Sequence, residues 1–383
     1  MGTGSAGRTG IALTEKQRIA WLRLIRSDNV GPSTFRDLIR HYGSAKAALA
    51  ALPELSQRGG STRAIRIASE QDALRELEAA HRFGARFLAI GEPDYPQALR
   101  EIDGAPPLVA VKGSLPMATR PAIGIVGSRN ASISGAKFTA MIARACGQAG
   151  YAVVSGLARG IDTAAHRASL ETGTIAAMAG GLDQPYPPEN IGLLNEIWDG
   201  NGLAVSEMPF GWEPRARDFP RRNRLISGIA LGVVVVEAAT RSGSLITARL
   251  AGEFGRLVFA VPGSPLDPRC EGTNGLLKDG AMIVTSPDDV IEALKPLAQP
   301  DLFRAQLAEA PTEKKGNPLS LPPDDTDRWQ IIDALGPTPV EIDDIIRHTG
   351  LSVSSVHSVL LELDMAGRLH RHPGGLVSIS MLD

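Results

Sequence analysis

The chain has 383 residues, a formal net charge of −2 at pH 7, and 43% hydrophobic and 21% charged residues. This length exceeds what one compact core accommodates, so two or three globular domains are expected. No stretch of about 18 uncharged apolar residues occurs, which excludes a membrane span.

The N-terminal sequence and the cysteines give no indication of export. Residues 1–10 are small and polar and are not followed by the apolar run of a signal peptide. Cys146 and Cys270, the only two cysteines, have no Cys or His neighbour at metal-binding spacing. We therefore expect buried thiols rather than a disulfide or a metal site, and a cytoplasmic protein.

Residues 1–82 predict a helical domain. Apolar residues recur at helical spacing on both sides of Asn29–Ser33, where Gly31 and Pro32 interrupt the helix and Ser33 is expected to cap the next one. The pattern resembles a SAM-like or helix-hairpin-helix unit, whose turn amides can contact a DNA phosphate. Residues 1–60 carry nine Lys and Arg against four Asp and Glu, so a DNA-contacting hairpin and a purely structural one both remain open.

Residues 83–295 alternate short apolar runs with amphipathic stretches, as in βαβ units with a largely parallel sheet. Strands are expected over Phe87–Ile90, Leu108–Val111, Ile123–Val126, Ala152–Val154, Ile175–Met178, Leu203–Val205, Val233–Val236, Val258–Val261 and Met282–Val284. Helices are expected over Ile133–Gln148, Asp162–Glu171, Asn190–Trp198, Asn223–Leu231 and Leu245–Phe254. The region is predicted to be a Rossmann-like α/β core, which binds ligands beyond the carboxyl ends of its strands.

The last part of the chain predicts a linker and a small domain. Residues 296–327 contain six prolines and little apolar periodicity, which is typical of a linker. Residues 328–383 resemble a winged helix, with helices near Trp329–Leu335, over Ile342–His348 and over Val353–Met365, and a hairpin over Leu369–Ile379. From Asp327 to Asp383 there are eight acids against four arginines, so protein docking or regulation is favoured over DNA binding.

Three strand-to-helix junctions each carry glycine, hydroxyl side chains and an arginine. They are Gly127–Asn130, Ser155–Asp162 and Thr240–Thr247. Glycine permits the sharp turn, while helix N-terminal amides, hydroxyls and guanidinium groups bind phosphate oxygens. We expect the three loops to form one phosphate cradle; the alternative is that they are only the tight turns of a doubly wound fold.

Between Pro214 and Arg224 five arginines stand against one acid, Asp218. They are Arg215, Arg217, Arg221, Arg222 and Arg224. Guanidinium groups bind phosphate bidentately and stack on bases, so this run predicts a polyanion at one mouth of the fold. A solvated loop with ion pairs to its neighbours is the alternative.

Catalytic signatures are weak. No Gly-x-x-x-x-Gly-Lys-Ser/Thr motif occurs, and His166 has no nucleophile nearby in sequence, so a structural histidine is favoured over a base. Glu207 and Glu237 follow strands, and we favour their orienting Arg224 or Arg129 over acting as general acids. The histidines of the last domain lack Cys partners, so no zinc site, no cofactor and no enzymatic activity are expected.

Several motifs in order resemble the DNA-processing protein A family (DprA, also called Smf). They are Gly127–Arg129, Ser155–His166, Tyr186–Asn190, Ser206–Pro209, Phe219–Arg224, Ser242–Ala248 and Val261–Gly263, with Asp94–Pro96 and Gly272–Asn274. The resemblance implies a single-stranded DNA-binding homodimer that loads the RecA recombinase and protects incoming DNA in natural transformation. The DNA-binding residues that it implies are Gly127, Ser128, Arg129, Ser155, Gly156, Arg159, Phe219, Arg221, Arg222, Asn223, Arg224, Ser242, Gly243, Ser244 and Thr247.

One departure concerns base stacking. Where the family often has an aromatic before a glycine, this chain has Ser132–Gly135 without one, so Phe219 or Phe210 would have to stack on bases. Two other functions remain open. One is a nucleotide phosphoribohydrolase resembling the cytokinin-activating LOG family, although its Pro-Gly-Gly-x-Gly-Thr loop is absent; the other is a nucleotide-sensing regulator.

Overall fold

The computed structural model describes residues 12–298 and 324–379. Contacts group the chain into two compact units. One contains the described residues from Glu76 to Ala298, and the other combines Leu13–Arg75 with the described C-terminal residues. No helix among the described residues is long and apolar enough to cross a membrane.

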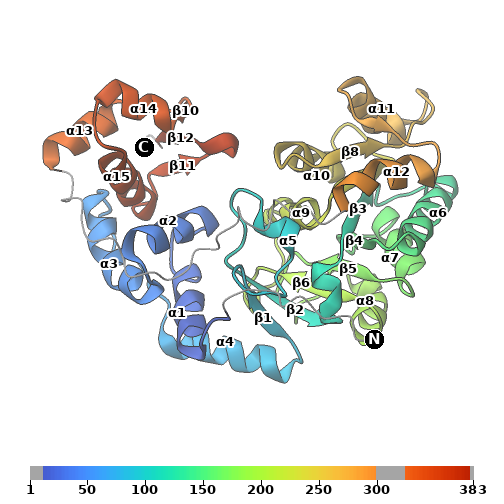
Figure 1. Cartoon of the computed structure of the whole chain (residues 1–383), viewed down its shortest axis with the longest axis horizontal. Coiled ribbons are helices and arrows are strands. Elements are labelled where there is room, and N and C mark those ends of the chain that lie inside the picture. The colour runs from blue at the N-terminus through green and yellow to red at the C-terminus, as the bar shows by residue number, and fades with distance from the viewer. Residues whose placement is uncertain (1–11, 299–323, 380–383) are drawn as a thin grey trace, which may run out of the picture. The chain divides into compact units, whose positions relative to one another are not determined.

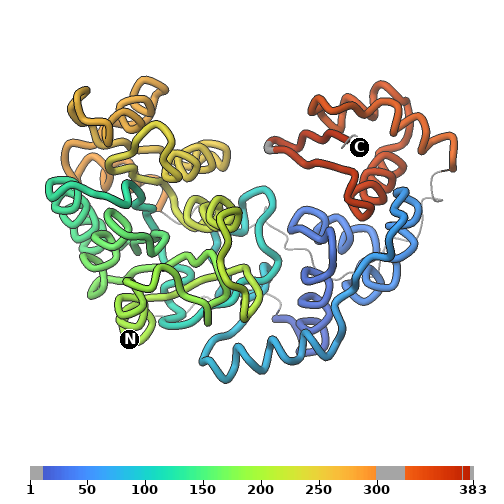
Figure 2. The backbone as a smooth tube through the Cα atoms, turned by 180° about the vertical axis from the view of Figure 1, so that it is seen from behind, coloured from blue at the N-terminus to red at the C-terminus, as the bar shows by residue number. Residues whose placement is uncertain are grey.

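The first unit is built on a nine-stranded sheet, with strand order β1-β2-β6-β5-β4-β3-β7-β8-β9. Figure 1 labels β1 to β6 and β8 of this sheet, and Figure 2 shows the backbone of the same chain from behind. The strands are β1 (Arg86–Ala89), β2 (Leu108–Gly113), β3 (Ala122–Gly127), β4 (Ala152–Ser155), β5 (Thr174–Ala177), β6 (Leu203–Ser206), β7 (Gly232–Val236), β8 (Leu257–Ala260) and β9 (Met282–Ile283). The pairs β1–β2 and β2–β6 are antiparallel, and every other pair is parallel. All nine predicted strands are confirmed within one or two residues at each end, as is the Rossmann-like α/β class.

The helices of this unit are α4 (Glu70–Arg82, which begins in the other unit), α5 (Gln97–Arg100), α6 (Ile133–Gln148), α7 (Ile161–Ser169), α8 (Ile191–Asp199), α9 (Asp218–Ile229), α10 (Gly243–Glu253), α11 (Glu271–Lys278) and α12 (Pro287–Ala298). The expected helix over Asn223–Leu231 begins five residues early, at Asp218. Phe219 to Arg222 therefore lie in the first turns of a helix and not in a loop before it. An acidic residue in the first turn favours this start.

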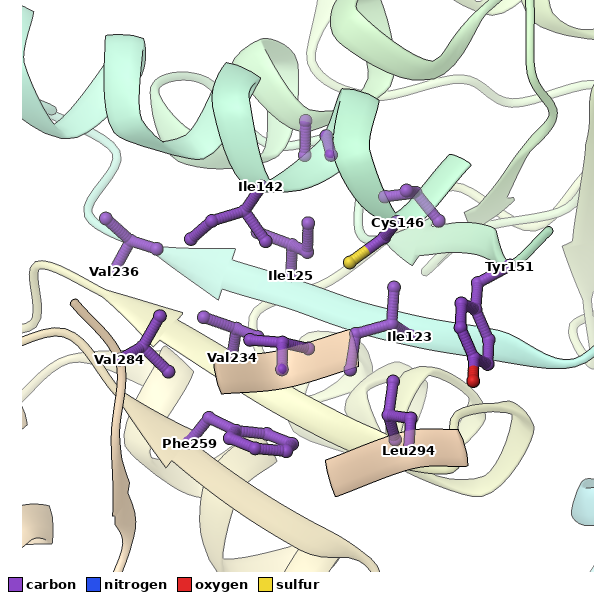
Figure 3. Packing of buried hydrophobic residues seen from close by; sticks show 14 of the residues in the cluster. Ile123, Ile125, Ile142, Cys146, Tyr151, Val234, Val236, Phe259, Val284 and Leu294 are labelled. Carbon is purple, nitrogen blue, oxygen red and sulfur yellow. The ribbon is translucent and has the colours of Figure 1, made fainter. Parts of the chain in front are cut away.

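The core lies between the central strands and helices α6, α7 and α12 (Figure 3). Ile123 and Ile125 of β3 meet Ile142 of α6, while Leu294 of α12 covers the same layer. Cys146 lies in this cluster, and burial raises the pKa of its thiol to about 12. It behaves as a small apolar side chain, as expected.

The second unit joins the two end regions of the chain. Its N-terminal helices are α1 (Glu15–Ile25), α2 (Pro32–Tyr42) and α3 (Ala45–Arg58). Gly31, not Ser33, is the N-cap of α2, with Pro32 in its first turn. The prediction for Ser33 was wrong because Pro32 is favoured at the first helical position and leaves Ser33 inside the helix.

The C-terminal part has the predicted winged-helix order: α13 (Asp325–Asp333), β10 (Val340–Glu341), α14 (Ile342–Thr349), α15 (Val353–Met365), β11 (Leu369–Arg371) and β12 (Leu376–Ile379). Helix α15 is buried on two faces. Its Val356, Val359, Leu360 and Leu363 belong to the winged-helix core. Leu361 and Met365 are buried outside that core, on a helix that packs against α3 and α2.

Polar contacts join the same two parts. Asn29, in the turn before α2, donates from Nδ2 to the carbonyl oxygen of Met365 over 3.0 Å. Arg371 pairs with Asp37 at 2.9 Å and with Asp364 at 2.8 Å. In this arrangement the hairpin turn, the expected phosphate contact of the N-terminal domain, contacts the winged helix, which supports the structural alternative.

Candidate functional site

A cavity of about 610 Å³ opens at the carboxyl ends of β3 and β7. It is bounded by the β3–α6 loop, the β4–α7 loop, the first turns of α9 and the β7–α10 loop. Its lining includes Gly127, Ser128, Arg129, Asn130, Ala158, Asp162, Tyr186, Ala216, Phe219, Pro220, Arg222, Asn223, Ile226, Arg241, Ser242, Gly243, Ser244, Ile246 and Thr247. The three glycine-containing loops therefore meet at one place.

The structure brings together most, but not all, of the residues that the sequence indicated. Gly127, Ser128, Arg129, Phe219, Arg222, Asn223, Ser242, Gly243, Ser244 and Thr247 line the cavity. Gly156 and Arg159 line a smaller adjoining cavity, which shares Arg129, Phe219 and Arg222 with the first. Ser155, Arg221 and Arg224 line neither.

Phe219 is the aromatic centre of the site. Its ring centroid lies 5.5 Å from that of Tyr186, edge to face, and 5.6 Å from Cζ of Arg129. The Tyr186 side chain is 48% exposed. Phe210, the other stacking candidate, instead packs against Phe83 and Phe87. It does not line the cavity, so only Phe219 of the two is placed to stack on a base.

Arg129 supplies an exposed positive charge at the cavity. No carboxylate within the described part of the chain lies within ion-pairing distance of it. Glu237, which was expected to orient Arg129, accepts bonds from the backbone nitrogen of Ser132 over 2.8 Å and from the Ser132 hydroxyl. That expectation was wrong because Glu237 caps the N-terminus of α6, where a negative charge is stabilised.

The cap at α6 also alters the expected phosphate cradle. Gly135 belongs to the same contact, because a Cβ there would lie 2.6 Å from the carboxyl carbon of Glu237. The Ser132 hydroxyl donates to Glu237 and accepts from the backbone nitrogen of Gly135 over 2.9 Å. The N-terminus of α6 therefore holds the protein's own carboxylate, and the amides of Ser132 and Gly135 are bonded within the protein.

The β4–α7 loop is also satisfied internally. Asp162 Oδ2 accepts from the amides of Gly156 at 3.0 Å and Ala158 at 3.4 Å, while the Ser155 hydroxyl donates to the carbonyl oxygen of Ile125. Burial raises the pKa of Asp162, and Arg222 and the two amides oppose that rise. The Ser155 hydroxyl and these two amides are thus bonded within the protein, and a direct contact of theirs with a ligand stays a prediction.

His166 fixes the same loop as a neutral side chain. Thr174 Oγ1 donates to the carbonyl oxygen of Val153, so its oxygen accepts from Nδ1 of His166 over 2.7 Å. Nε2 then accepts from the amide of Leu157 over 3.3 Å. Burial, with the nearby charge of Arg222, lowers the pKa of His166 to about 3. The structural role predicted for this histidine is confirmed.

Arg222 is an internal arginine that connects α9 to the sheet. Only 6% exposed, it donates to the carbonyl oxygen of Ala177 over 2.9 Å and to that of Gly156. Burial lowers the pKa of Arg222 to about 10; Asp162 opposes this shift and Arg129 adds to it. Two guanidinium groups thus lie near the Phe219 ring, because Arg222 Cζ is 5.9 Å and Arg129 Cζ 5.6 Å from its centroid.

Arg221 and Arg224 share one carboxylate, that of Glu207, which follows β6 and has a side chain that is only 4% exposed. Glu207 lies 3.0 Å from Arg221 and 2.6 Å from Arg224. Burial opposes ionisation of Glu207, but the two arginines outweigh it and lower the pKa of its carboxyl below the ordinary value. The orienting role predicted for Glu207 toward Arg224 is confirmed. Of the five arginines in the run, only Arg215 and Arg217 remain exposed without a carboxylate among the described residues.

The β7–α10 loop presents a more open helix N-terminus. Ser242 caps α10 by accepting from the amide of Ser244 over 3.3 Å, and Asn223 Nδ2 donates to the carbonyl oxygen of Gly243 over 3.2 Å. Arg241, exposed beside it, was not among the predicted site residues, nor was Tyr186. Both stand within motifs that the sequence singles out, but nothing local shows that their side chains reach the cavity.

No cluster of three or more His, Cys, Asp or Glu side chains suited to a metal ion occurs in the described ranges 12–298 and 324–379. The cavity contains two aromatic side chains in edge-to-face contact, Phe219 and Tyr186, beside the exposed Arg129 and Arg241. Such a set can hold a phosphate and a planar base.

Sequence profiles of known families match all three regions of the chain. The profile described as DNA recombination-mediator protein A matches residues 86–295. Those described as a DprA-like N-terminal HHH domain and a DprA winged helix domain match residues 15–79 and 315–375.

Similar proteins agree with these profiles. Protein Smf of Synechocystis sp. is 32% identical over 94% of this chain and 98% of its own length. DNA processing protein DprA of Streptococcus pneumoniae is 46% identical over 51% of this chain and 70% of its own length. The solved S. pneumoniae DprA structure matches with a TM-score of 0.60 and 35% identity, covering 74% of this chain and 98% of that one. The solved structure of DNA processing protein A from Helicobacter pylori, described by its single-stranded DNA binding mode, matches with a TM-score of 0.51 and 28% identity. The match covers 56% of this chain and 97% of that one.

Proposed function

This chain belongs to the DNA recombination-mediator protein A family, and from that membership we propose that it binds single-stranded DNA in the cavity beside Phe219. Bound DNA is protected and handed to the RecA recombinase during natural transformation. The protein acts by binding and not by catalysis. In support, Asp162, which lines the cavity, and His166 and Glu237 nearby are all engaged in internal hydrogen bonds.

The observation that carries this proposal is the exposed positive charge of Arg129 beside an aromatic ring. Cζ of Arg129 lies 5.6 Å from the Phe219 centroid, and no carboxylate among the described residues pairs with it, so a phosphate at this place would meet an uncompensated charge. A nucleotide supplies both the phosphate and a planar base for Phe219 and Tyr186. Sequence-independent binding follows, because phosphate contacts and stacking do not read base edges.

The residues contribute in two ways. Ser128, Arg129, Asn223, Ser242 and Gly243 line the cavity and contact DNA directly, together with Arg159 at its smaller extension. Ser155, Gly156, Arg221 and Arg224 act indirectly, because their polar groups hold α9 and the β4–α7 loop in place.

A second copy of the chain is proposed to cover the β9 edge of the sheet. Met282 and Ile283 of this edge strand are 42% and 55% exposed, an apolar pair beside unpaired backbone groups. An Ile283→Lys variant is expected to shift the protein toward monomer in sedimentation equilibrium. A wild-type protein that is monomeric at all concentrations would contradict this part of the proposal.

Fluorescence anisotropy with labelled oligothymidine, single- and double-stranded, over a salt series tests the DNA proposal. We expect tight, salt-sensitive binding that prefers the single strand and weakens in Arg129→Ala. If Arg129 contacts one phosphate, the slope of log affinity against log salt should fall by about one unit. Arg144→Ala, which removes an exposed arginine of α6 outside the cavity, is the matched control. Absence of binding at low salt would overturn the proposal.

A further inference from the structure

The loop between β6 and α9 is held in a fixed shape beside the cavity. Asp218 Oδ2 accepts from Nε1 of Trp212 and from the backbone nitrogen of Arg215, each over 2.9 Å. The other end of the loop is tied by the amide of Gly211, which donates to Asp183 at 2.9 Å. Asp218, the only acid in the arginine run, therefore binds the loop itself and pairs with none of the arginine side chains in the run.

Within this loop a guanidinium group lies on an indole. Cζ of Arg215 is 4.7 Å from the centroid of the Trp212 ring. Arg215 is exposed, so a ligand can reach its side chain from solvent. In the described ranges 12–298 and 324–379 no carboxylate pairs with it. The planar group is thus oriented in advance, which reduces the entropy lost when a ligand stacks on it.

The stack adjoins the edge of the cavity. Ala216, the next residue, lines the cavity, and the exposed Arg217 follows it. A strand that places one nucleotide beside Phe219 and leaves the cavity on this side passes Arg215. Its next base meets a guanidinium plane, and its next phosphate meets the charges of Arg215 and Arg217.

We propose that Trp212 and Arg215 form a second nucleotide-binding site beside the cavity, in which the neighbouring base of a single strand stacks on the Arg215 guanidinium plane. This inference rests on the proposed binding of single-stranded DNA. It extends the protein's contact with the strand beyond the nucleotide held at Phe219. The ligand is a second, adjoining nucleotide of the same strand, recognised by its phosphate and its flat base and not by its sequence.

The test is the dependence of affinity on oligonucleotide length. Anisotropy is measured for oligothymidines from the shortest that binds upward, with wild type, Arg215→Ala, Arg215→Lys and the control Arg144→Ala. Arg215→Ala keeps the backbone bond to Asp218, and thermal unfolding confirms that the variant folds. Lysine keeps the charge but loses the planar group.

We expect Arg215→Ala to bind the shortest oligonucleotide like wild type and to lose about five-fold or more in affinity for longer ones, as for one lost stacking contact. Arg215→Lys should keep the wild-type salt slope and still bind longer strands more weakly. Equal weakening at every length would overturn the inference by placing Arg215 in the first site, as would affinities equal to those of Arg144→Ala. If wild type binds no oligonucleotide, it is the proposed function that fails, before Arg215 is tested.

Discussion

The hydroxyl of Thr34 donates to Asp364 Oδ2 over 2.7 Å, a bond between residues 330 positions apart. Asp364 also forms an ion pair with Arg371, which forms a second ion pair with Asp37. This three-part contact joins α2 to the end of α15 and the first strand of the wing. It shows that the two end regions of the chain form one packed unit.

We expect Arg371→Ala to destabilise this unit by about 3 kcal/mol or more, because removal of one partner leaves the largely buried Asp364 uncompensated. Thermal or denaturant unfolding of the full chain measures the loss. Arg347→Ala is the control, since Arg347 and Asp344 form an exposed pair, worth about 1 kcal/mol at most. Equal stability of the two variants would show that the contact does not hold the unit together.

Phe219→Leu is expected to weaken binding of oligothymidine by about 1–3 kcal/mol through loss of stacking. The comparison is Phe210→Leu, which removes an aromatic contact with Phe83 and Phe87 away from the cavity. That variant should lower the free energy of unfolding and leave the affinity of the folded protein unchanged. The reverse pattern would transfer the stacking role to Phe210.

The Glu207 carboxyl predicts a defined acid dependence. Its folded-state pKa is lowered below 4.5, so its ionisation stabilises the fold above that pH, and the contribution disappears as pH falls through the lowered value. Between the two values the unfolded chain binds more protons, and stability therefore rises with pH. Glu207→Gln should reduce stability at neutral pH and flatten this dependence in denaturant titrations. Glu189→Gln is the control, because Glu189 and Arg159 form an exposed ion pair. It should change the free energy of unfolding little at any pH tested.

Gly156→Ala is expected to destabilise the first unit by about 1–3 kcal/mol, since overpacking a filled site forces neighbours to move. The added Cβ would overlap the guanidinium group of Arg222, which two carbonyl oxygens hold in place. Gly252→Ala is the opposite case. It lies in α10 with open space around it, and alanine there should stabilise the helix by about 0.5–1 kcal/mol. Calorimetry of the two variants should therefore give shifts of opposite sign.

The central strands could be placed from the sequence because β3 and β7 are uninterrupted apolar runs, which only a sheet covered on both faces explains. The positions of two of the loops followed from the same pattern, since β3 ends at Gly127 and Gly156 follows β4. The start of α9 was missed because Phe219 and Pro220 precede its apolar periodicity. Its first turn is fixed by contacts with other elements, including the bonds of Arg222 to Gly156 and Ala177.

The second face of α15 had a sequence signal that was not used. Leu361 and Met365 are spaced four residues apart and lie off the face formed by Val356 and Leu360. A helix that is apolar on two sides has to be covered twice. Its partner could not be named from the sequence, because α3 lies some three hundred positions earlier and any exposed apolar helix would satisfy the same pattern.

Local periodicity and the motifs in the loops were enough to predict the order of strands and helices along the chain, the family, and the loops that meet at the cavity. Which charges remain available to a ligand became known from the three-dimensional contacts. Arg221 and Arg224 share the carboxylate of Glu207, Arg222 donates to carbonyl oxygens, and Arg129 and Arg215 stay exposed. Charge compensation acts over a few ångströms in space, and the residues that provide it come from strands and loops distant in the chain.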